Sequence, residues 1–215
     1  MIRSVLCYGD SNTFGTATVD RPDGRYGPDE RWPGVLRAAL GSGWLVIEEG
    51  LGGRTTVNDD PVEGIEKNGR TYLYPSLMSH KPLDVVAIML GTNDLKQRFG
   101  KSPWEIAEGV GVLVELVQKA RAGRGEGVPE IIVMAPAPFL KKIPLHADLF
   151  AGAYEKSQAA AGYYRAVAGR LGVRFFEAGS VMKSSKVDGF HLDPDAHAAL
   201  GKAMAAEIGK IKFTK

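Results

Sequence analysis

A serine, an aspartate and a histidine stand where they could act as a nucleophile, an orienting acid and a base. Ser11 follows Gly9-Asp10, directly after an apolar run at residues 2–8. Asp188 precedes His191 by three residues, close enough on a turn for its carboxylate to accept the Nδ1 proton of the imidazole. A serine hydroxyl becomes an effective nucleophile when a base removes its proton. The three residues therefore predict nucleophilic catalysis, in the chain order Ser-Asp-His.

Donors for the negative charge of a tetrahedral intermediate are expected after two other strands. Gly53 follows the second predicted strand, and glycine lets the backbone approach a ligand closely. Asn93 follows the third, and its side-chain amide can point into the site. We expect the Ser11 N–H, the Gly53 N–H and the Asn93 amide to form an oxyanion hole. Gly52 remains open as an alternative to Gly53.

The hydrophobic pattern predicts a scaffold that brings these distant residues together. Strand-like apolar runs alternate with segments of helical spacing, which predicts a parallel sheet with helices on both faces, a three-layer α/β/α sandwich. In such sheets ligands bind at the carboxyl ends of the strands, where the candidate residues stand. The predicted strands are residues 2–8, 44–48, 84–90, 130–135 and 173–176. The predicted helices are residues 31–40, 103–120, 149–171 and 194–208.

Two irregular stretches interrupt the alternation. Residues 20–29 and 55–70 are rich in Gly, Pro, Asp and Asn, and long loops of this kind are usually functional or mobile. No internal repeat, low-complexity tract or linker is visible, so residues 1–215 are expected to form a single domain.

Composition excludes several classes of protein. The 27 basic and 25 acidic residues are interspersed and give a net charge of +2, which argues against nucleic-acid and membrane-surface partners. The single cysteine, Cys7, lies in the first apolar run and is expected to be a buried thiol; no Cys/His cluster predicts a metal site. No signal peptide and no long apolar run is apparent, so a cytoplasmic protein is expected.

The candidate residues resemble the four ordered blocks of the SGNH (GDSL-type) hydrolase superfamily. The blocks are Gly9-Asp10-Ser11, a glycine near Gly53, Gly91-Thr92-Asn93-Asp94 and Asp188-x-x-His191. Longer strings, such as Glu48-Glu49-Gly50-Leu51 and Arg54-Thr55-Thr56, are similar to the bacterial arylesterase/acyltransferase branch. The resemblance implies the SGNH fold with a flavodoxin-like sheet, hydrolysis of short-chain acyl (acetyl or aryl) esters of small molecules and acyl transfer to alcohols. It also implies no cofactor and a homo-oligomer whose inserted loops restrict the entrance to the active site.

The substrate pocket is expected to be bordered by Asn12, Arg54, Thr92 and Phe190. Asn12 departs from the family pattern, which commonly has leucine after the serine. Asp10 and Asp94 are expected to support their loops by accepting backbone hydrogen bonds.

Other functions remain open on the same scaffold. Carbohydrate deacetylation, lysophospholipase and thioesterase activities fit the same residues. A nucleotide-binding module fits the βα alternation, but the run at residues 50–55 lacks the third glycine of GxGxxG, and no GxxxxGK[ST] occurs. The pentapeptide GxSxG is also absent around Ser11, which argues against an ordinary α/β-hydrolase.

Overall fold

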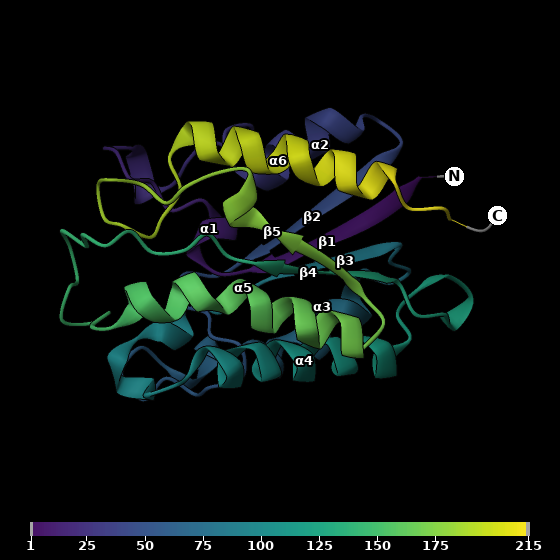
Figure 1. The fold of residues 1–215 in the computed structure, drawn as a ribbon. Coiled ribbons are helices and arrows are strands. Elements are labelled where there is room, and N and C mark those ends of the chain that lie inside the picture. The colour runs from purple at the N-terminus through teal and green to yellow at the C-terminus, as the bar shows by residue number, and fades with distance from the viewer. Residues whose placement is uncertain (1, 214–215) are drawn as a thin grey trace.

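Five parallel strands form the middle layer of the computed structural model, which describes residues 2–213 (Figure 1). The strands lie in the order β2-β1-β3-β4-β5, so the chain reverses its direction of travel across the sheet at β1. This order confirms the predicted fold class, and it puts a switch point between the carboxyl ends of β1 and β3. The strands are β1 (Arg3–Gly9), β2 (Trp44–Gly50), β3 (Val85–Met89), β4 (Glu130–Ala135) and β5 (Arg174–Glu177).

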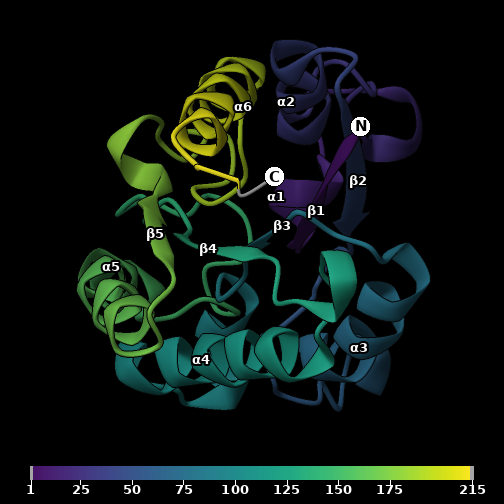
Figure 2. The same ribbon diagram turned by 90° about the vertical axis from the view of Figure 1, so that its right-hand side faces the viewer.

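Helices cover both faces of the sheet. Figure 2 shows α2 and α6 on one side and α3, α4 and α5 on the other, while the short α1 follows β1. In the described part of the chain, no helix combines the length and apolar character needed to cross a membrane. The helices are α1 (Ser11–Phe14), α2 (Trp32–Leu40), α3 (Gly69–His80), α4 (Pro103–Ala120), α5 (Ala153–Arg170) and α6 (Pro194–Gly209).

Two hydrophobic clusters hold the three layers together. Successive side chains of a strand point to opposite faces, so β1 sends Leu6 and Tyr8 to the cluster under α3, α4 and α5. Val5 and Cys7 enter the cluster under α2 and α6, and Cys7 is fully buried, as predicted. A strand buried on both faces needs a continuous apolar run, which explains why the central strands are visible in the sequence.

The predicted elements match the structure closely, with two differences. The helix α4 has the predicted bounds, and Ser102 and Glu105 form a capping box at its start. The helix α5 begins four residues late, after Gly152 in the left-handed conformation. Two helices were not predicted, the one-turn α1 and the longer α3, which contains Pro75 and has no pronounced apolar stripe.

Candidate active site

Ser11 stands at a sharp turn between β1 and α1. The side chain of Asp10 caps this turn by accepting the N–H of Asn12 at 2.9 Å. Gly9 is required here, because a Cβ at this position would lie 2.1 Å from Thr13 Oγ1. The turn therefore puts Ser11 at the first position of α1, where a backbone N–H has no partner within its own helix.

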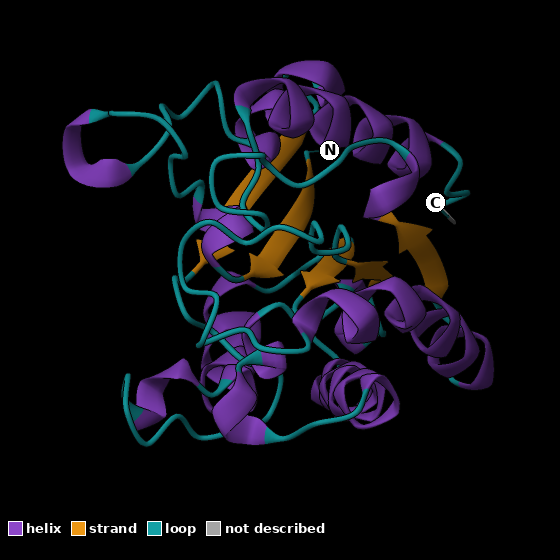
Figure 3. Cartoon of the chain, turned by 60° about the vertical axis from the view of Figure 1, so that its left-hand side comes forward, coloured by secondary structure: helices purple, strands orange, loops and turns teal. Residues whose placement is uncertain are grey.

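Ser11, His191 and Asp188 are hydrogen-bonded in series. The Ser11 hydroxyl lies 3.0 Å from His191 Nε2, and His191 Nδ1 lies 2.7 Å from Asp188 Oδ2. With Nδ1 donating to the carboxylate, Nε2 is left to accept the serine proton. The structure thus brings together three side chains from the two ends of the chain, one directly after β1 and two in the loop before α6. Figure 3 shows that loops gather at the carboxyl edge of the sheet.

Asp188 also shapes the backbone of its own loop. Its Oδ1 accepts the N–H groups of Phe190 and His191, both at 3.0 Å. Burial alone raises the pKa of Asp188, but the hydrogen bonds from His191 and from these two N–H groups outweigh it and hold the pKa below its ordinary value. Asp188 therefore stays ionised and keeps the imidazole oriented.

Phe190 forms an aromatic cluster beneath the histidine. Its ring centroid lies 4.8 Å from that of Phe150, 5.3 Å from that of Phe139 and 4.4 Å from that of His191. Only 7% of Phe190 is exposed, so most of its surface supports the loop. Its role at the border of the substrate pocket stays a prediction.

The candidate oxyanion donors follow three adjacent strands. Ser11 follows β1, Gly53 lies in the turn after β2, and Asn93 follows β3. Asn93 Nδ2 donates to Arg54 O at 3.1 Å, which uses one of its two N–H bonds and leaves the other. Among the described residues, neither Gly52 nor Gly53 has an acceptor for its backbone N–H.

Arg54 lies behind this turn, and its guanidinium group is buried. Its Nη1 donates to Gly9 O at 2.9 Å and also to Glu49 O, and the guanidinium lies 4.2 Å from the centre of the Tyr8 ring. Arg54 is 3% exposed and connects the ends of β1 and β2. These contacts give it a structural role, while its predicted contact with substrate stays a prediction.

Thr92 borders a narrow apolar cleft beside Asn93. The walls of this cleft also include Leu95, Ile106 and Phe139. Tyr164 of α5 closes one side and donates its hydroxyl hydrogen to Leu90 O at 2.8 Å. Nothing in the sequence indicated this role for Tyr164, because its contact with the end of β3 arises only when α5 packs on the sheet.

The two supporting aspartates act as predicted. Asp94 accepts the Thr56 N–H and hydroxyl and the Asn58 amide, so it holds the loop after β2 against the loop after β3. Asp10 is completely buried, and this burial raises its pKa to about 6 in spite of the hydrogen bond from Asn12. Each carboxylate therefore fixes a loop that carries a candidate catalytic residue.

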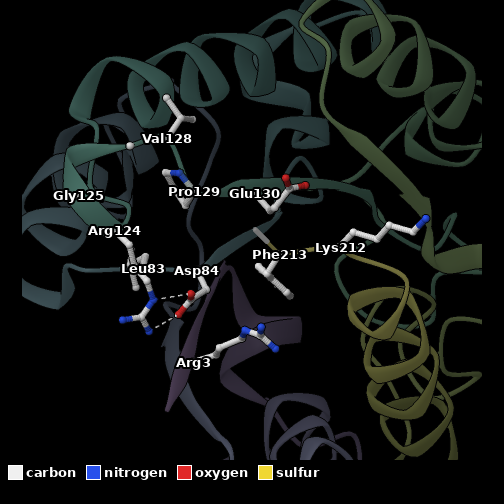
Figure 4. Close-up of a pocket in the computed structure, with 11 residues that line it drawn as sticks. Arg3, Leu83, Asp84, Arg124, Gly125, Val128, Pro129, Glu130, Lys212 and Phe213 are labelled. Carbon is white, nitrogen blue, oxygen red and sulfur yellow. Dashed lines mark hydrogen bonds and ion pairs between the residues drawn. The ribbon is translucent and has the colours of Figure 1, made fainter. Parts of the chain in front are cut away.

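A large depression lies at the opposite edge of the sheet. It has a volume of about 840 Å³ and surrounds the ion pair of Arg124 with Asp84, in which the two N···O distances are 2.7 and 2.8 Å (Figure 4). None of the described residues in its walls is a serine, cysteine or histidine. Within residues 2–213, no group of three or more His, Cys, Asp and Glu side chains is arranged as a metal site. The chemistry-bearing residues therefore concentrate at the carboxyl edge.

A serine, a histidine and an aspartate in series at the carboxyl edge of a parallel sheet are typical of hydrolases that act on acyl groups. The chain belongs to the GDSL-like lipase/acylhydrolase family, whose sequence model matches residues 7–199. It is a carboxylic ester hydrolase. No curated protein sequence matches the chain.

Solved structures of bacterial esterases are similar over nearly the whole chain. A carbohydrate acetylesterase from Sinorhizobium meliloti is 44% identical with a TM-score of 0.91, and 96% of this chain and 98% of that chain are covered. The native aryl esterase of M. smegmatis is 41% identical with a TM-score of 0.90 and the same coverage. A putative arylesterase from Agrobacterium tumefaciens is 39% identical with a TM-score of 0.88, covering 98% of this chain and all of that chain (100%).

Proposed function

We propose that the protein is a serine esterase that cleaves short-chain acyl esters through an acyl-enzyme intermediate. The observation that carries this proposal is the hydrogen-bonded series from the Ser11 hydroxyl through His191 to Asp188. A base within 3.0 Å of the nucleophile, itself held by a carboxylate, meets the geometric requirement for proton removal during attack.

In the proposed reaction, Ser11 Oγ attacks the ester carbonyl carbon while His191 Nε2 takes the hydroxyl proton. The carbonyl oxygen becomes an oxyanion, which the N–H groups of Ser11 and Gly53 and the Asn93 amide stabilise. The C–O bond to the leaving group then breaks, and His191 gives its proton to the leaving alkoxide. Water attacks the acyl-enzyme with His191 again as the base, and Ser11 is regenerated when the acid leaves.

Similarity to solved structures described as an aryl esterase and a carbohydrate acetylesterase supports a short acyl group. Resemblance to the arylesterase/acyltransferase branch further supports acyl transfer, in which an alcohol replaces water in the second half of the reaction. The same resemblance supports a homo-oligomer, and the βα alternation without a visible linker supports one domain over residues 1–215.

The variant Ser11→Ala tests the proposal. Removal of the nucleophile is expected to lower kcat for p-nitrophenyl acetate by at least about 10⁴-fold, because the remaining residues of such a site act only as a unit with it. A serine-directed organophosphate should add one label to the wild type and none to the variant, as measured by intact mass. An unchanged circular dichroism spectrum controls for folding. Retention of most of the activity by the folded variant would contradict the proposal.

A second candidate is the removal of acetyl groups from carbohydrates. It is favoured by the 44% identity to a protein described as a carbohydrate acetylesterase. Acetate release from acetylated xylose or xylan should then proceed with a kcat/KM above that for p-nitrophenyl acetate, and Ser11→Ala should abolish both. A higher kcat/KM on the aryl ester favours the first candidate, and an optimum on long acyl chains contradicts both.

A further inference from the structure

We propose that Asn12 is a positioning residue that holds His191 within reach of Ser11. The inference rests on the proposed function, since it assigns Asn12 a part in the same reaction. Asn12 Nδ2 donates to the Phe190 carbonyl oxygen at 3.2 Å, across 178 residues of sequence. The acceptor belongs to the peptide group that leads directly into His191.

That peptide group is held at both of its ends. Its carbonyl oxygen accepts from Asn12, and its N–H, which belongs to His191, donates to Asp188 Oδ1 at 3.0 Å. On the far side of the same residue, the Ser185 N–H donates to His191 O at 2.7 Å. A planar peptide group whose carbonyl and N–H are both hydrogen-bonded cannot rotate freely. The Cα of His191, and with it the Cβ that carries the ring, therefore stays in place.

The bond from Asn12 differs from these others in what it connects. The contacts of Asp188 and Ser185 lie within the loop at residues 181–193 and would move with it. In the described part of the chain, one hydrogen bond besides Ser11–His191 joins α1 directly to this loop, and it comes from Asn12. Because Asn12 follows Ser11 on the same short helix, it couples the position of the base to that of the nucleophile.

The cost of burying Asn12 supports a functional role. The residue is 5% exposed, and its Oδ1 is buried with no hydrogen-bond partner among the described residues. An unsatisfied buried polar atom lowers the stability of the fold, and an apolar side chain of similar size would avoid this cost. Asn12 therefore does not give this position the highest stability. Its replacement is expected to change kcat more strongly than it changes Tm.

This geometry also distinguishes positioning from substrate selection. A residue that borders the acyl pocket changes the ratio of rates between short and long acyl groups. A residue that positions the base changes kcat for every ester by the same factor and leaves KM nearly unchanged, because alignment of the reacting groups is lost while binding remains.

The test uses two variants and a matched control. Asn12→Leu keeps the approximate size and removes both polar atoms, while Asn12→Asp keeps the shape and cannot donate to the Phe190 carbonyl. Gln118→Leu serves as the control, because Gln118 Nε2 also donates to a backbone carbonyl, Leu171 O, at 3.2 Å, but at the amino edge of the sheet. All four proteins are compared by circular dichroism, by Tm, by kcat and KM on p-nitrophenyl acetate, butyrate and hexanoate, and by the rate of labelling with an organophosphate.

Both Asn12 variants are expected to lower kcat and the labelling rate on the order of 10- to 100-fold, the loss typical of a reacting group displaced by about 1 Å. The relative rates on the three esters should stay within twofold of the wild type, and Gln118→Leu should keep wild-type rates. Wild-type labelling rates in a folded Asn12→Asp or Asn12→Leu protein would overturn the inference, as would a changed ester preference with unchanged kcat on the acetate. Failure of the wild type to be labelled at Ser11 would instead overturn the proposed function.

Discussion

At the scale of single residues, the turn after β2 contains two glycines with different surroundings. Gly53 has a φ of +80°, and a Cβ there would lie 2.6 Å from Glu63 Oε2. Gly52 has open space around its Cβ position. A side chain at Gly53 therefore strains the turn by about 1–2 kcal/mol in addition to displacing Glu63, while a side chain at Gly52 fits.

This difference allows a test of which glycine donates to the oxyanion. Gly53→Ala is expected to lower kcat/KM for p-nitrophenyl acetate by roughly 10- to 100-fold, somewhat less than the full loss of a donor, because the N–H is displaced rather than removed. Gly52→Ala, the control, should stay within about twofold of the wild type, since a substitution without strain is usually near neutral. A larger loss in Gly52→Ala than in Gly53→Ala would assign the donor to Gly52.

The sequence predicts the roles of some residues of the site and not those of others. Residue type and spacing predict Ser11, Asp188 and His191 as nucleophile, orienting acid and base, because these roles have few chemical alternatives, and the structure shows the three side chains hydrogen-bonded in series. The contacts of Asn12 and Arg54 were not predictable. Each binds a backbone carbonyl that is brought near by the fold, and carbonyl groups are identical at every position of the sequence.

At the scale of elements, a buried histidine joins α6 to α2. His197 is completely buried, its Nδ1 accepts the Trp32 N–H at 3.1 Å, and its ring packs edge-on against Tyr26. Burial, with smaller effects from the charges of His191 and Arg31, lowers the pKa of His197 to about 4. The contact between the two helices therefore requires a neutral imidazole.

This requirement predicts how stability depends on pH. The pKa of His197 falls from 6.5 in the unfolded chain to about 4 in the fold, so protonation favours unfolding. Its contribution is fully present above pH 6.5 and is lost as the pH falls towards 4, a loss of about 3 kcal/mol. Asp10 acts in the opposite direction, because its pKa is raised from 3.8 to about 6 and its contribution is lost as the pH rises through that range.

His197→Gln separates the two effects, since glutamine offers an acceptor to Trp32 and does not titrate. Asp10 is common to both proteins, so its effect cancels in their difference. Between pH 7 and pH 4, the free energy of unfolding of the variant should improve by about 3 kcal/mol relative to the wild type. Urea unfolding at pH 7, 5 and 4 provides the measurement. A constant difference across this range would show that His197 titrates normally in the fold.

The helices α4 and α3 differ in how clearly the sequence predicts them. The helix α4 has an apolar stripe, a proline in its first turn and a capping box, so local signals agree at every level. The helix α3 lacks such a stripe and contains Pro75, and its start follows a loop whose composition favours turns. Packing of Leu73 and Leu77 into the core stabilises α3, and this packing depends on elements distant in sequence.

At the scale of the whole molecule, strand order decides where the chemistry is possible. With β1 between β2 and β3, the segments that follow these three strands meet at one edge. Ser11, Gly53 and Asn93 lie in those segments, and the loop before α6 adds Asp188 and His191. The large depression around Arg124 lies at the other edge, so the volume of a depression is a poor guide to the location of this site.

By itself, the sequence determined the fold class, the bounds of most elements and the residue types that catalyse ester cleavage in the proposed mechanism. These properties depend on short-range periodicity and on the chemistry of individual side chains. Only the tertiary structure decided that the Ser11 hydroxyl lies 3.0 Å from His191 Nε2, and which groups hold it there. Such distances depend on packing between segments as far apart as Asn12 and Phe190, whose meeting no local pattern encodes.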